Sequence, residues 1–542
     1  MIKTPYLAFM LIALPFFSCK KNDDSPTTPP AQNFLSASAA SLTLNGSLIN
    51  SKDSLNIESN VNWSISVSPS SVTWFTPSIT SGNGNSKVYI TVTEMNNTGV
   101  ERAASIVITA IGNSTIPSVT VQIRQAPQSF TALSKLFGGT QNDQFQSVIK
   151  ASDGGYVIAG YTHSNNGDLT TNAGDADFWM AKINSGGTIL WSKTLGGSNI
   201  DIASSVVESA DGGYVFAGQS SSSDGDFSGG HGSTDIWAIK LNVNGSLVWK
   251  KAYGGSGFES CNSDRSITLA GNDFVLSGGT SSNDGDVTGL HNPGSGNGDA
   301  WVFKINSTGN IIWQKCLGGS AVDQSWGVTS ITGGGFIVSA ISLSSDGDAT
   351  NNKGLYDFWA IKLNDNGSII WQKNLGGSGQ DFARSIVGTP DGGCAITGST
   401  ESTNGDVTGN HGIRDIWVIK LDGNGNLNWQ KCLGGTNYED SYGICLNSSG
   451  GYMVTGYTLS TNGDVSGGYT KPDAWLVEID GSGNKLWQKS IGGSGTSGES
   501  GVSVALLSTN DEFIMAGYTS SNDGDVSGFH GVIDGWLYKF KP

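Results

Sequence analysis

Residues 146–197 read QSVIKASDGGYVIAGYTHSNNGDLTTNAGDADFWMAKINSGGTILWSKTLGG. Four short runs rich in Val, Ile, Trp and Tyr are separated by Gly, Asn and Asp, a pattern typical of four antiparallel strands. The third run, 177–184, is apolar on both faces, so an isolated sheet would leave one of those faces in water. Sheets of this kind must therefore stack on one another.

The same unit recurs up to the end of the chain. A Gly-Gly pair marks each copy and begins at Gly138, Gly196, Gly254, Gly318, Gly376, Gly434 and Gly492. An Asp-x-Trp element recurs in step, with Trp179, Trp237, Trp301, Trp359, Trp417, Trp475 and Trp536. The copies are 58 residues apart, except for one interval of 64. Seven four-stranded units that stack radially predict an all-β fold, a seven-bladed β-propeller, over residues 129–542.

The two ends of the repeat region support a closed ring. The last unit stops at WLYKFKP without a fourth strand, whereas ALSKLFGG, residues 132–139, aligns with a fourth strand but precedes the first unit. We expect this N-terminal strand to complete the last sheet, which removes an exposed edge. An open solenoid, the alternative, explains neither the missing strand nor the spare one. The repeats resemble bacterial β-propeller families with GGyvvaGyT and D-x-W-x-x-K patterns, a resemblance that implies no activity.

The N-terminus predicts export and lipidation. Residues 1–18 carry Lys3, a short apolar run and a small residue before Cys19, as expected for a signal peptide. The FFSC segment resembles a bacterial lipobox, which implies that Cys19 is lipidated; a signal peptide with an incidental cysteine is the alternative. The charged residues that follow are similar to the export tags of Bacteroidota surface lipoproteins. We therefore expect a flexible tether over 19–33, an anchor in outer-membrane lipid through Cys19, and exposure at the cell surface.

Residues 34–126 predict a separate β-sandwich. The runs SLNIESNVNWSISV, KVYITVTEM and SVTVQIRQ alternate apolar and polar residues and are separated by turn clusters. The order Trp63, Trp74, a Gly-rich turn at 82–84, an N-x-T-G-x-x-R stretch ending at Arg102 and a final strand at 119–125 resembles the BACON domain. That family often stands N-terminal in Bacteroidota surface proteins. The resemblance implies binding of carbohydrate or mucin, or a role as a spacer only.

Composition excludes several classes of protein. With 78 glycines, 13 prolines and 14% charged residues, long helices and disorder are both disfavoured. A net charge of −17 without a basic patch excludes nucleic acid as a partner. The five cysteines after Cys19 are irregularly spaced and form no CxxC, so we expect buried thiols and neither a disulfide framework nor a zinc site.

Acidic residues concentrate in the loops that should share one mouth of the ring, where we expect about half of the 46 aspartates and glutamates. Turn capping by aspartate is the plain interpretation. Catalysis by paired carboxylates is another interpretation, and it is disfavoured because every unit repeats the same residues. No cofactor is required, but calcium is possible, although the spacing does not match an EF-hand. Its expected ligands are the aspartates of the GD loops, Asp168, Asp226, Asp286, Asp348, Asp406, Asp464 and Asp525.

Other candidates for ligand contact come from the histidines and from departures from the repeat. His231, His291, His411 and His530 occupy matching positions, but Lys353 and Tyr469 replace them elsewhere, so a shared metal site is excluded. Trp326 and Tyr438 lack counterparts in the other units. Aromatic side chains at a mouth rich in loops can stack on sugar rings, although a buried structural role is the alternative.

The sequence thus predicts a non-enzymatic surface protein that binds a glycan or another extracellular polymer, with no residue assigned to catalysis. A propeller-type glycoside hydrolase or polysaccharide lyase is one alternative. A protein–protein adhesion or scaffolding module is another. The identity of the ligand and the oligomeric state do not follow from the sequence.

Overall fold

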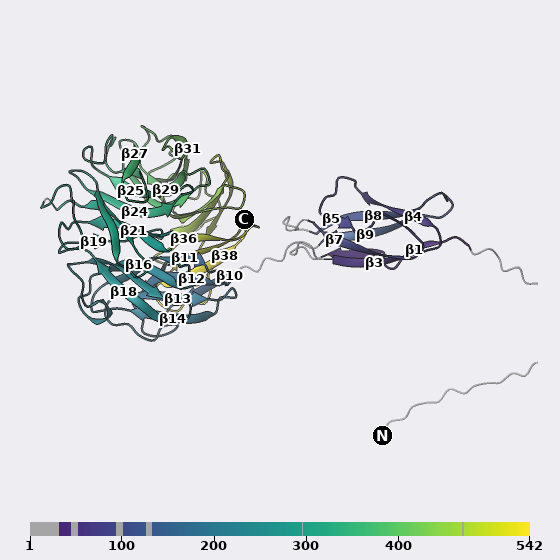
Figure 1. Ribbon diagram of the computed structural model, residues 1–542, viewed down its shortest axis with the longest axis horizontal. Helices are drawn as coiled ribbons and strands as arrows, with labels where there is room; N and C mark the ends of the chain where they lie inside the picture. The colour runs from purple at the N-terminus through teal and green to yellow at the C-terminus, as the bar shows by residue number, and fades with distance from the viewer. Residues whose placement is uncertain (1–31, 45–51, 94–100, 126–132, 295, 469–470) are drawn as a thin grey trace, which may run out of the picture. The chain divides into compact units, whose positions relative to one another are not determined.

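The computed structural model describes residues 32–44, 52–93, 101–125, 133–294, 296–468 and 471–542. The chain divides into two compact units, Met1–Ser129 and Phe130–Pro542 (Figure 1). The predicted signal peptide, Cys19 and the tether up to residue 31 lie outside the described residues. Within the described ranges, no helix has the length and apolar character needed to cross a membrane.

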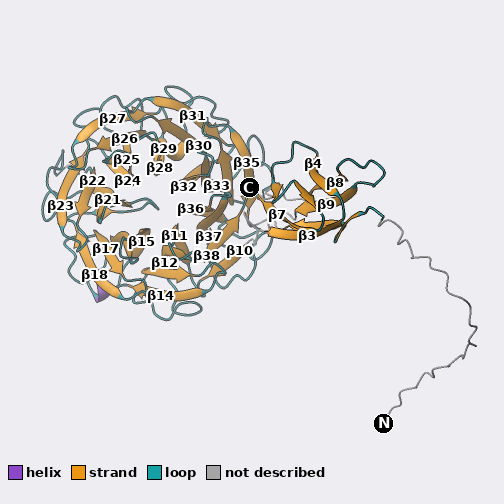
Figure 2. Ribbon diagram, turned by 45° about the vertical axis from the view of Figure 1, so that its right-hand side comes forward, coloured by secondary structure: helices purple, strands orange, loops and turns teal. Residues whose placement is uncertain are grey.

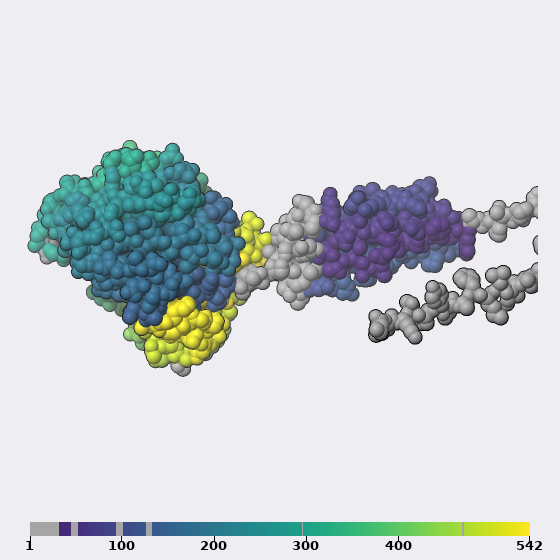
Figure 3. Space-filling model, turned by 90° about the horizontal axis from the view of Figure 1, so that it is seen from below, coloured from purple at the N-terminus to yellow at the C-terminus, as the bar shows by residue number. Residues whose placement is uncertain are grey.

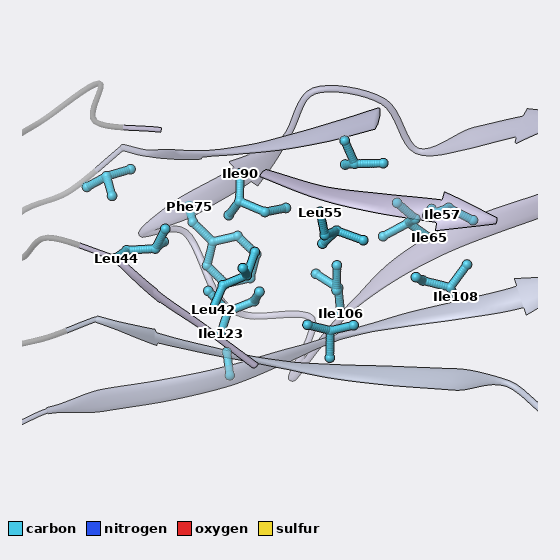
Figure 4. Close-up of a cluster of buried hydrophobic side chains, with 14 of the residues drawn as sticks. Leu42, Leu44, Leu55, Ile57, Ile65, Phe75, Ile90, Ile106, Ile108 and Ile123 are labelled. Atoms are coloured by element: carbon cyan, nitrogen blue, oxygen red, sulfur yellow. The ribbon is translucent and has the colours of Figure 1, made fainter. Parts of the chain in front are cut away.

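The first unit consists of short strands in two sheets. Its strands are β1 (Leu35–Ala37), β2 (Ser41–Leu44), β3 (Lys52–Ser59), β4 (Asn62–Ser68), β5 (Phe75–Pro77), β6 (Ser81–Asn83), β7 (Ser86–Val92), β8 (Arg102–Ala110) and β9 (Val119–Gln125). One sheet has the order β1-β3-β7-β5 and the other the order β2-β9-β8-β4-β6. Both sheets contribute alternate side chains to one apolar core (Figure 4).

Trp63 explains the glycine-rich turn of this unit. Its side chain is fully buried, and its Nε1 donates a hydrogen bond of 2.9 Å to Gly84 O. A Cβ at Gly82 would lie only 2.3 Å from the indole ring, so the turn passes over the tryptophan only with glycine there. Trp63 and the glycine-rich turn, two of the features that carry the resemblance to the BACON domain, are therefore in contact, and the resemblance itself stays a prediction.

The second unit is a set of antiparallel sheets around a common centre, as in a β-propeller (Figure 2). Its strands are β10 (Leu133–Phe137), β11 (Asp143–Lys150), β12 (Tyr156–Thr162), β13 (Asp177–Ile183), β14 (Ile189–Leu195), β15 (Asp201–Glu208), β16 (Tyr214–Ser220), β17 (Asp235–Leu241), β18 (Leu247–Tyr253), β19 (Glu259–Ser260), β20 (Ile267–Ala270), β21 (Asp273–Thr280), β22 (Asp299–Ile305), β23 (Ile311–Leu317), β24 (Asp323–Ser330), β25 (Phe336–Ser342), β26 (Asp357–Leu363), β27 (Ile369–Leu375), β28 (Asp381–Gly388), β29 (Cys394–Thr400), β30 (Asp415–Leu421), β31 (Leu427–Leu433), β32 (Glu439–Leu446), β33 (Tyr452–Thr458), β34 (Asp473–Ile479), β35 (Lys485–Ile491), β36 (Glu499–Ser508), β37 (Glu512–Thr519) and β38 (Asp534–Phe540). The sheets of this unit have four strands each, except one of five strands, in which β20 also pairs with β21. A short 3-10 turn, Gly225–Phe227, is the one helical element of the described residues. Most sheets run in chain order, as β11-β12-β13-β14 does, with the first strand innermost.

Two tryptophans hold successive sheets together in six of the units, and the last unit has only the first of them, Trp536. All seven residues of β13 are buried, and Trp179 in its centre has no exposed surface. Phe178 and Met180 of the same strand pack in one core with Phe216 of the next sheet. Trp191 on the outer strand donates its Nε1 hydrogen to Val243 O, in a turn of the following unit. A strand that is apolar on both faces is therefore stable because each sheet covers its neighbour.

The start and the end of the second unit lie side by side (Figures 1 and 3). Strand β10 pairs with β38 in antiparallel register, from Leu133 opposite Lys539 to Phe137 opposite Gly535. Leu136 and Phe137 are buried at 5% and 1% exposure. The sheet β10-β38-β37-β36 is therefore built from both ends of the unit, which is the pairing that the missing fourth strand predicts.

The five cysteines of the second unit are Cys261, Cys316, Cys394, Cys432 and Cys445, and all are buried, unpaired thiols. Burial raises the pKa of the Cys394 thiol to about 12, so this side chain stays protonated. The cysteines therefore act as packing residues, as expected from their spacing.

Candidate ligand-binding site

The aspartates of the GD loops bind backbone amides. Gly138 N donates to Asp168 Oδ2 at 3.0 Å, and Gly376 N donates to Asp406 Oδ2 at 3.1 Å. Equivalent bonds of 3.3–3.4 Å reach Asp226, Asp286, Asp464 and Asp525, while Asp348 Oδ2 lies 3.4 Å from His291 Nε2. Among the residues that the structure describes, no group of three or more His, Cys, Asp or Glu could hold a metal ion. These contacts fit turn capping, and calcium binding stays a prediction.

A second set of carboxylates is buried beneath the same loops and accepts hydrogen bonds from them. Asp381 accepts hydrogen bonds from Gly377 N at 2.8 Å, from Ser402 Oγ at 2.9 Å and from Thr400 Oγ1. Its equivalents are Asp143, Asp201, Glu259, Asp323, Glu439 and Glu499, none more than 1% exposed. Sequence reasoning missed Glu499 because the insertion SGTSGES displaces it. Much of the acidic charge expected at the mouth is therefore internal, because these side chains hold backbone amides and hydroxyls.

The matching histidines pack against the aspartate that precedes each tryptophan. His291 Nδ1 lies 2.7 Å from Asp299 Oδ2, and His411 Nδ1 lies 2.7 Å from Asp415 Oδ2. His530 makes the same contact with Asp534 at 2.9 Å, and His231 with Asp235 at 3.5 Å. These contacts are local to each unit and fit loop packing. A role of the histidines in ligand contact stays a prediction.

A cavity of about 320 Å³ lies among the innermost strands of the second unit. It is lined by Gln144, Gln146, Asn262, Ser263, Asp264, Trp326, Arg384, Tyr442, Val502 and Tyr518. The structure thus places Trp326 in a cavity wall, whereas Tyr438 is 39% exposed and lies outside this lining.

Six of these lining residues occupy one and the same place in their units, the third residue after the buried Asp or Glu of the innermost strand. This position holds Gln146, Ser204, Asn262, Trp326, Arg384, Tyr442 and Val502 in successive units. The buried acid three residues earlier is always Asp or Glu, but this position carries a different amino acid in every unit. The cavity is therefore formed where the units diverge, and an alignment of the units by the buried acid would have predicted it.

The third unit contributes an irregular segment to the cavity lining, with Asn262, Ser263 and Asp264. Its innermost strand is broken into β19 and β20, and the segment between them leaves the sheet. Ser385 Oγ of β28 donates to Asp264 Oδ1 at 2.8 Å, and Ser205 Oγ of β15 donates to Asp264 O at 2.8 Å. Arg265 Nη2 donates to Ile444 O of β32 at 3.2 Å. The segment therefore spans the space between opposite sheets, a feature that its polar run CNSDRS could have indicated.

Arginine and aromatic side chains form one wall of the cavity. The Arg384 guanidinium lies 4.1 Å from the centre of the Trp326 ring, 5.5 Å from that of Phe382 and 5.8 Å from that of Tyr442. A guanidinium stacked on an aromatic face keeps its hydrogen-bond donors directed sideways. This wall therefore combines flat apolar faces with fixed polar edges.

A second arginine connects this wall to the exposed rim. Arg414 lies 5.3 Å from the centre of the Phe382 ring and 5.9 Å from that of Tyr438. Arg414 Nε also donates to Glu401 Oε1 at 3.1 Å. Asp440 Oδ2 lies 3.7 Å from Arg384 and 3.9 Å from Arg414. The cluster thus joins Trp326 and Tyr438, which sequence reasoning had singled out separately.

Two carboxylates near the cavity have no counterpart in the other units, Asp264 and Asp440. The Asp264 side chain has no exposed surface and that of Asp440 is 3% exposed. Burial raises the pKa of Asp264, while the adjacent Arg265 lowers it. Catalytic carboxylates must touch the substrate, whereas the Asp264 side chain has no exposed surface although the residue lines the cavity, and Asp440 is not among the lining residues.

Fold and site together define a repeat protein of the β-propeller type with an arginine–aromatic cavity among its innermost strands. No family model and no curated protein matches the chain. Among solved structures, it is similar to the Pan2 WD40 domain of Neurospora crassa, at 9% identity over 73% of this chain and 89% of that chain, with a TM-score of 0.40. The GH93 α-L-arabinofuranosidase of Fusarium graminearum in complex with arabinobiose shows 10% identity over 75% and 97% of the two chains, with a TM-score of 0.38.

A GH5 xyloglucanase of Bacteroides ovatus, in complex with a XXXG heptasaccharide, is 25% identical over 22% of this chain, with a TM-score of 0.16. The match covers 29% of that enzyme. All three TM-scores are low, so none of these similarities bears on function.

Proposed function

We propose that this protein is a lipid-anchored, non-enzymatic binding protein of the cell surface. In this proposal, the second unit is a seven-bladed propeller closed by β10, and the BACON-like sandwich lifts it from the membrane. The ligand is a glycan or another extracellular polymer. The observation that carries the proposal is the cavity itself, which is lined by the one inner-strand position at which every unit carries a different residue.

The chemistry of the cavity suits a carbohydrate. The faces of Trp326 and Tyr442 offer flat surfaces for the C–H groups of a sugar ring. Gln144, Asn262 and the Arg384 guanidinium provide amide and guanidinium groups for sugar hydroxyls. A volume of about 320 Å³ is at the small end of ligand pockets, so the cavity would take one end or a short part of a polymer.

A second hollow adjacent to the first would extend the site. It measures about 240 Å³ and is lined by residues that include Phe258, Ser260, Gly279 and Gln324. Ser260 and Gln324 stand two residues before Asn262 and Trp326 of the first cavity, on the same strands or their continuation. Three other units carry tyrosine where Gly279 stands, so the hollow opens where a bulky side chain is missing. The two hollows share no lining residue, but their closeness along these chain segments favours an extended ligand.

Two other functions remain alternatives. A glycoside hydrolase or lyase would use Asp264 and Asp440 as its pair of carboxylates, but the burial of both groups favours binding over catalysis. A protein–protein adhesion module would use the exposed loops rather than the cavity. If substitutions in the cavity abolish ligand binding, the ligand binds in the cavity. If binding persists in these variants, adhesion through the loops is favoured.

The experiment is a glycan-array screen of residues 20–542, with calcium and with chelator, followed by titration of the best glycan. We expect Trp326→Ala and Arg384→Ala to weaken binding at least tenfold, which corresponds to about 1.4 kcal/mol. Arg384→Lys keeps the charge but loses the flat guanidinium, so it should weaken binding as well. Tyr89→Ala, at an exposed aromatic residue of the first unit, is the matched control. Absence of binding to any glycan in both conditions would contradict the proposal.

The anchor is tested separately. Metabolic labelling with an alkyne fatty acid should mark the wild-type chain and leave Cys19→Ala unmarked. Protease treatment of whole cells should then degrade the second unit if it is displayed at the surface. If the wild-type chain stays unlabelled, Cys19 is not lipidated and residues 1–18 act as an ordinary signal peptide.

A further inference from the structure

Junctions between successive sheets bring two carboxyl groups together, and those of Asp357 and Asp177 lack the histidine that stands at four of the others. A Cβ at Gly376 would lie 2.4 Å from Asp357 Oδ1 and 2.5 Å from Asp381 Oδ2, so both oxygens border the same small space. At the corresponding junction of an earlier unit, a Cβ at Gly196 would lie 2.0 Å from Asp177 Oδ1. Asp201, the equivalent of Asp381, follows in that loop. None of the four side chains belongs to the ligand cavity.

One member of each pair is fully supplied with hydrogen-bond donors. Asp381 Oδ2 accepts from Gly377 N and Ser402 Oγ, and its Oδ1 accepts from Thr400 Oγ1. Asp201 has the same set of donors from Gly197 N, Ser222 Oγ and Ser220 Oγ. These donors stabilise the ionised form of Asp381 and Asp201.

The other member of each pair has one oxygen without a donor. Asp357 Oδ2 accepts from Lys353 N at 2.7 Å, and Asp177 Oδ2 accepts from Ala173 N at 2.7 Å. The Oδ1 atoms of both residues are buried and have no hydrogen-bond partner among the described residues. Asp357 is 0% exposed and Asp177 is 2% exposed. A buried carboxylate oxygen without a donor is costly, unless that oxygen itself carries a proton.

The charges around each pair favour the protonated form. Asp357 faces Asp381, Asp406 and Lys353, and the Lys353 ammonium is bound to Asp406 and to Asn374 O. Burial and the neighbouring carboxylates raise the pKa of Asp357 to about 7.

Asp177 faces Asp201, Asp226 and His163, and the imidazole of His163 contacts Asp175 at 3.2 Å. Burial, together with Asp201 and Asp226, raises the pKa of Asp177 to about 6. Each junction thus holds two acidic groups with no cation bound to either of them among the described contacts.

Four other junctions add a histidine beside the aspartate, although the Oδ1 atoms of Asp235, Asp415 and Asp534 also lack a hydrogen-bond partner among the described residues. There the imidazole contacts the aspartate, as His411 Nδ1 does at 2.7 Å from Asp415 Oδ2. The junctions of Asp177 and Asp357 have Ala173 and Lys353 at the histidine position. The spacing of the two carboxyl groups is the same at the histidine-bearing junctions, since a Cβ at Gly434 would lie 2.5 Å from Glu439 Oε2 and 2.7 Å from Asp415 Oδ1. The junctions of Asp177 and Asp357 therefore differ from them in the missing imidazole.

We propose that Asp357 and Asp177 each hold a proton on Oδ1 near neutral pH and donate it to the facing carboxylate, Asp381 or Asp201. Each pair is then a buried proton-binding site that joins two sheets. The folded pKa of the protonated member lies above its unfolded value. The stabilisation is therefore complete below the unfolded pKa and is lost as the pH rises through the folded pKa. The second unit should loosen at these two junctions in mildly alkaline solution.

The test replaces the protonated member by its neutral isostere, in residues 20–542 with chelator present so that no divalent cation interferes. In Asp357→Asn and Asp177→Asn, the amide nitrogen can donate where the carboxylic acid did. We expect the wild-type unfolding temperature to fall between pH 5.5 and pH 8.5, and the double variant to lose a measurable part of that fall. Infrared spectra near pH 5.5 should show a band of neutral carboxylic acid that weakens in the double variant.

Asp415→Asn, at a histidine-bearing junction, is the matched control and should retain the wild-type dependence on pH. Equal dependence on pH in the wild type and the double variant would overturn the proposal. So would infrared spectra with the same neutral-acid band in both proteins. Should one variant fail to fold, the single variant at the other junction decides between these outcomes.

Discussion

Removal of the Phe137 side chain tests whether the N-terminal strand closes the ring. Phe137 is 1% exposed and packs in one core with Phe145, whose ring centre lies 5.9 Å away, and with Trp179. Truncation of a buried Phe to Ala typically costs about 3–5 kcal/mol, a large part of the roughly 5–15 kcal/mol that stabilises a folded protein. Strand β10 is paired with a single neighbour, β38, so the loss should first appear as local opening of this pair.

The assay combines urea unfolding with hydrogen exchange. We expect Phe137→Ala to unfold at lower urea and to speed amide exchange in β38, at residues such as Leu537 and Lys539 that stand opposite β10. Leu190→Ala, on an outer strand at 58% exposure, is the control and should change stability by less than about 0.5 kcal/mol. If Phe137→Ala behaves like this control in both measurements, β10 does not complete the last sheet and the closed ring is wrong.

Three further predictions concern the loops, the irregular segment in the cavity lining and calcium. Gly376→Ala should destabilise the protein by about 1–3 kcal/mol in urea unfolding, because its methyl group would meet two carboxylate oxygens at 2.4 and 2.5 Å. Gly186→Ala, whose nearest neighbour is 3.4 Å away, should be neutral, and equal effects of both changes would contradict this reasoning. Ser385→Ala removes a donor from the buried Asp264 and should cost about 1–3 kcal/mol; an unchanged urea midpoint would mean that this contact does not hold the segment. Calcium in the GD loops predicts a higher unfolding temperature with calcium than with chelator, and identical temperatures would contradict calcium binding.

The strand pattern could be predicted from the sequence because it depends on local and repeated features. The period-two alternation of the first unit and the apolar third strand of each repeat are visible in single segments. The additional strand at residues 133–137 and the missing fourth strand after Phe540 predict the pairing of β10 with β38. The repeat also predicts that Trp179 and its equivalents lie between sheets, because every copy preserves them.

Tertiary structure decided which carboxylates are internal and which residues line a site. The acids that follow the Gly-Gly pairs appear as loop residues in the sequence, but the fold buries them because they bind backbone amides and hydroxyls. Glu499 escaped sequence reasoning because an insertion displaces it. The position shared by Trp326, Arg384 and Tyr442 acquires meaning only when the sheets surround one centre, since these residues stand 58 apart along the chain.

The repeating unit, the order of its strands and the pairing of the two ends of the repeat region can therefore be predicted from the sequence, because short-range patterning and burial are set within each copy. Only the tertiary structure decided the cavity, the segment that lines it at Asp264 and the facing carboxyl groups at Asp357 and Asp381. These features depend on distances between different units. Such distances follow from how the sheets pack around their common centre, and no local pattern of residues encodes them.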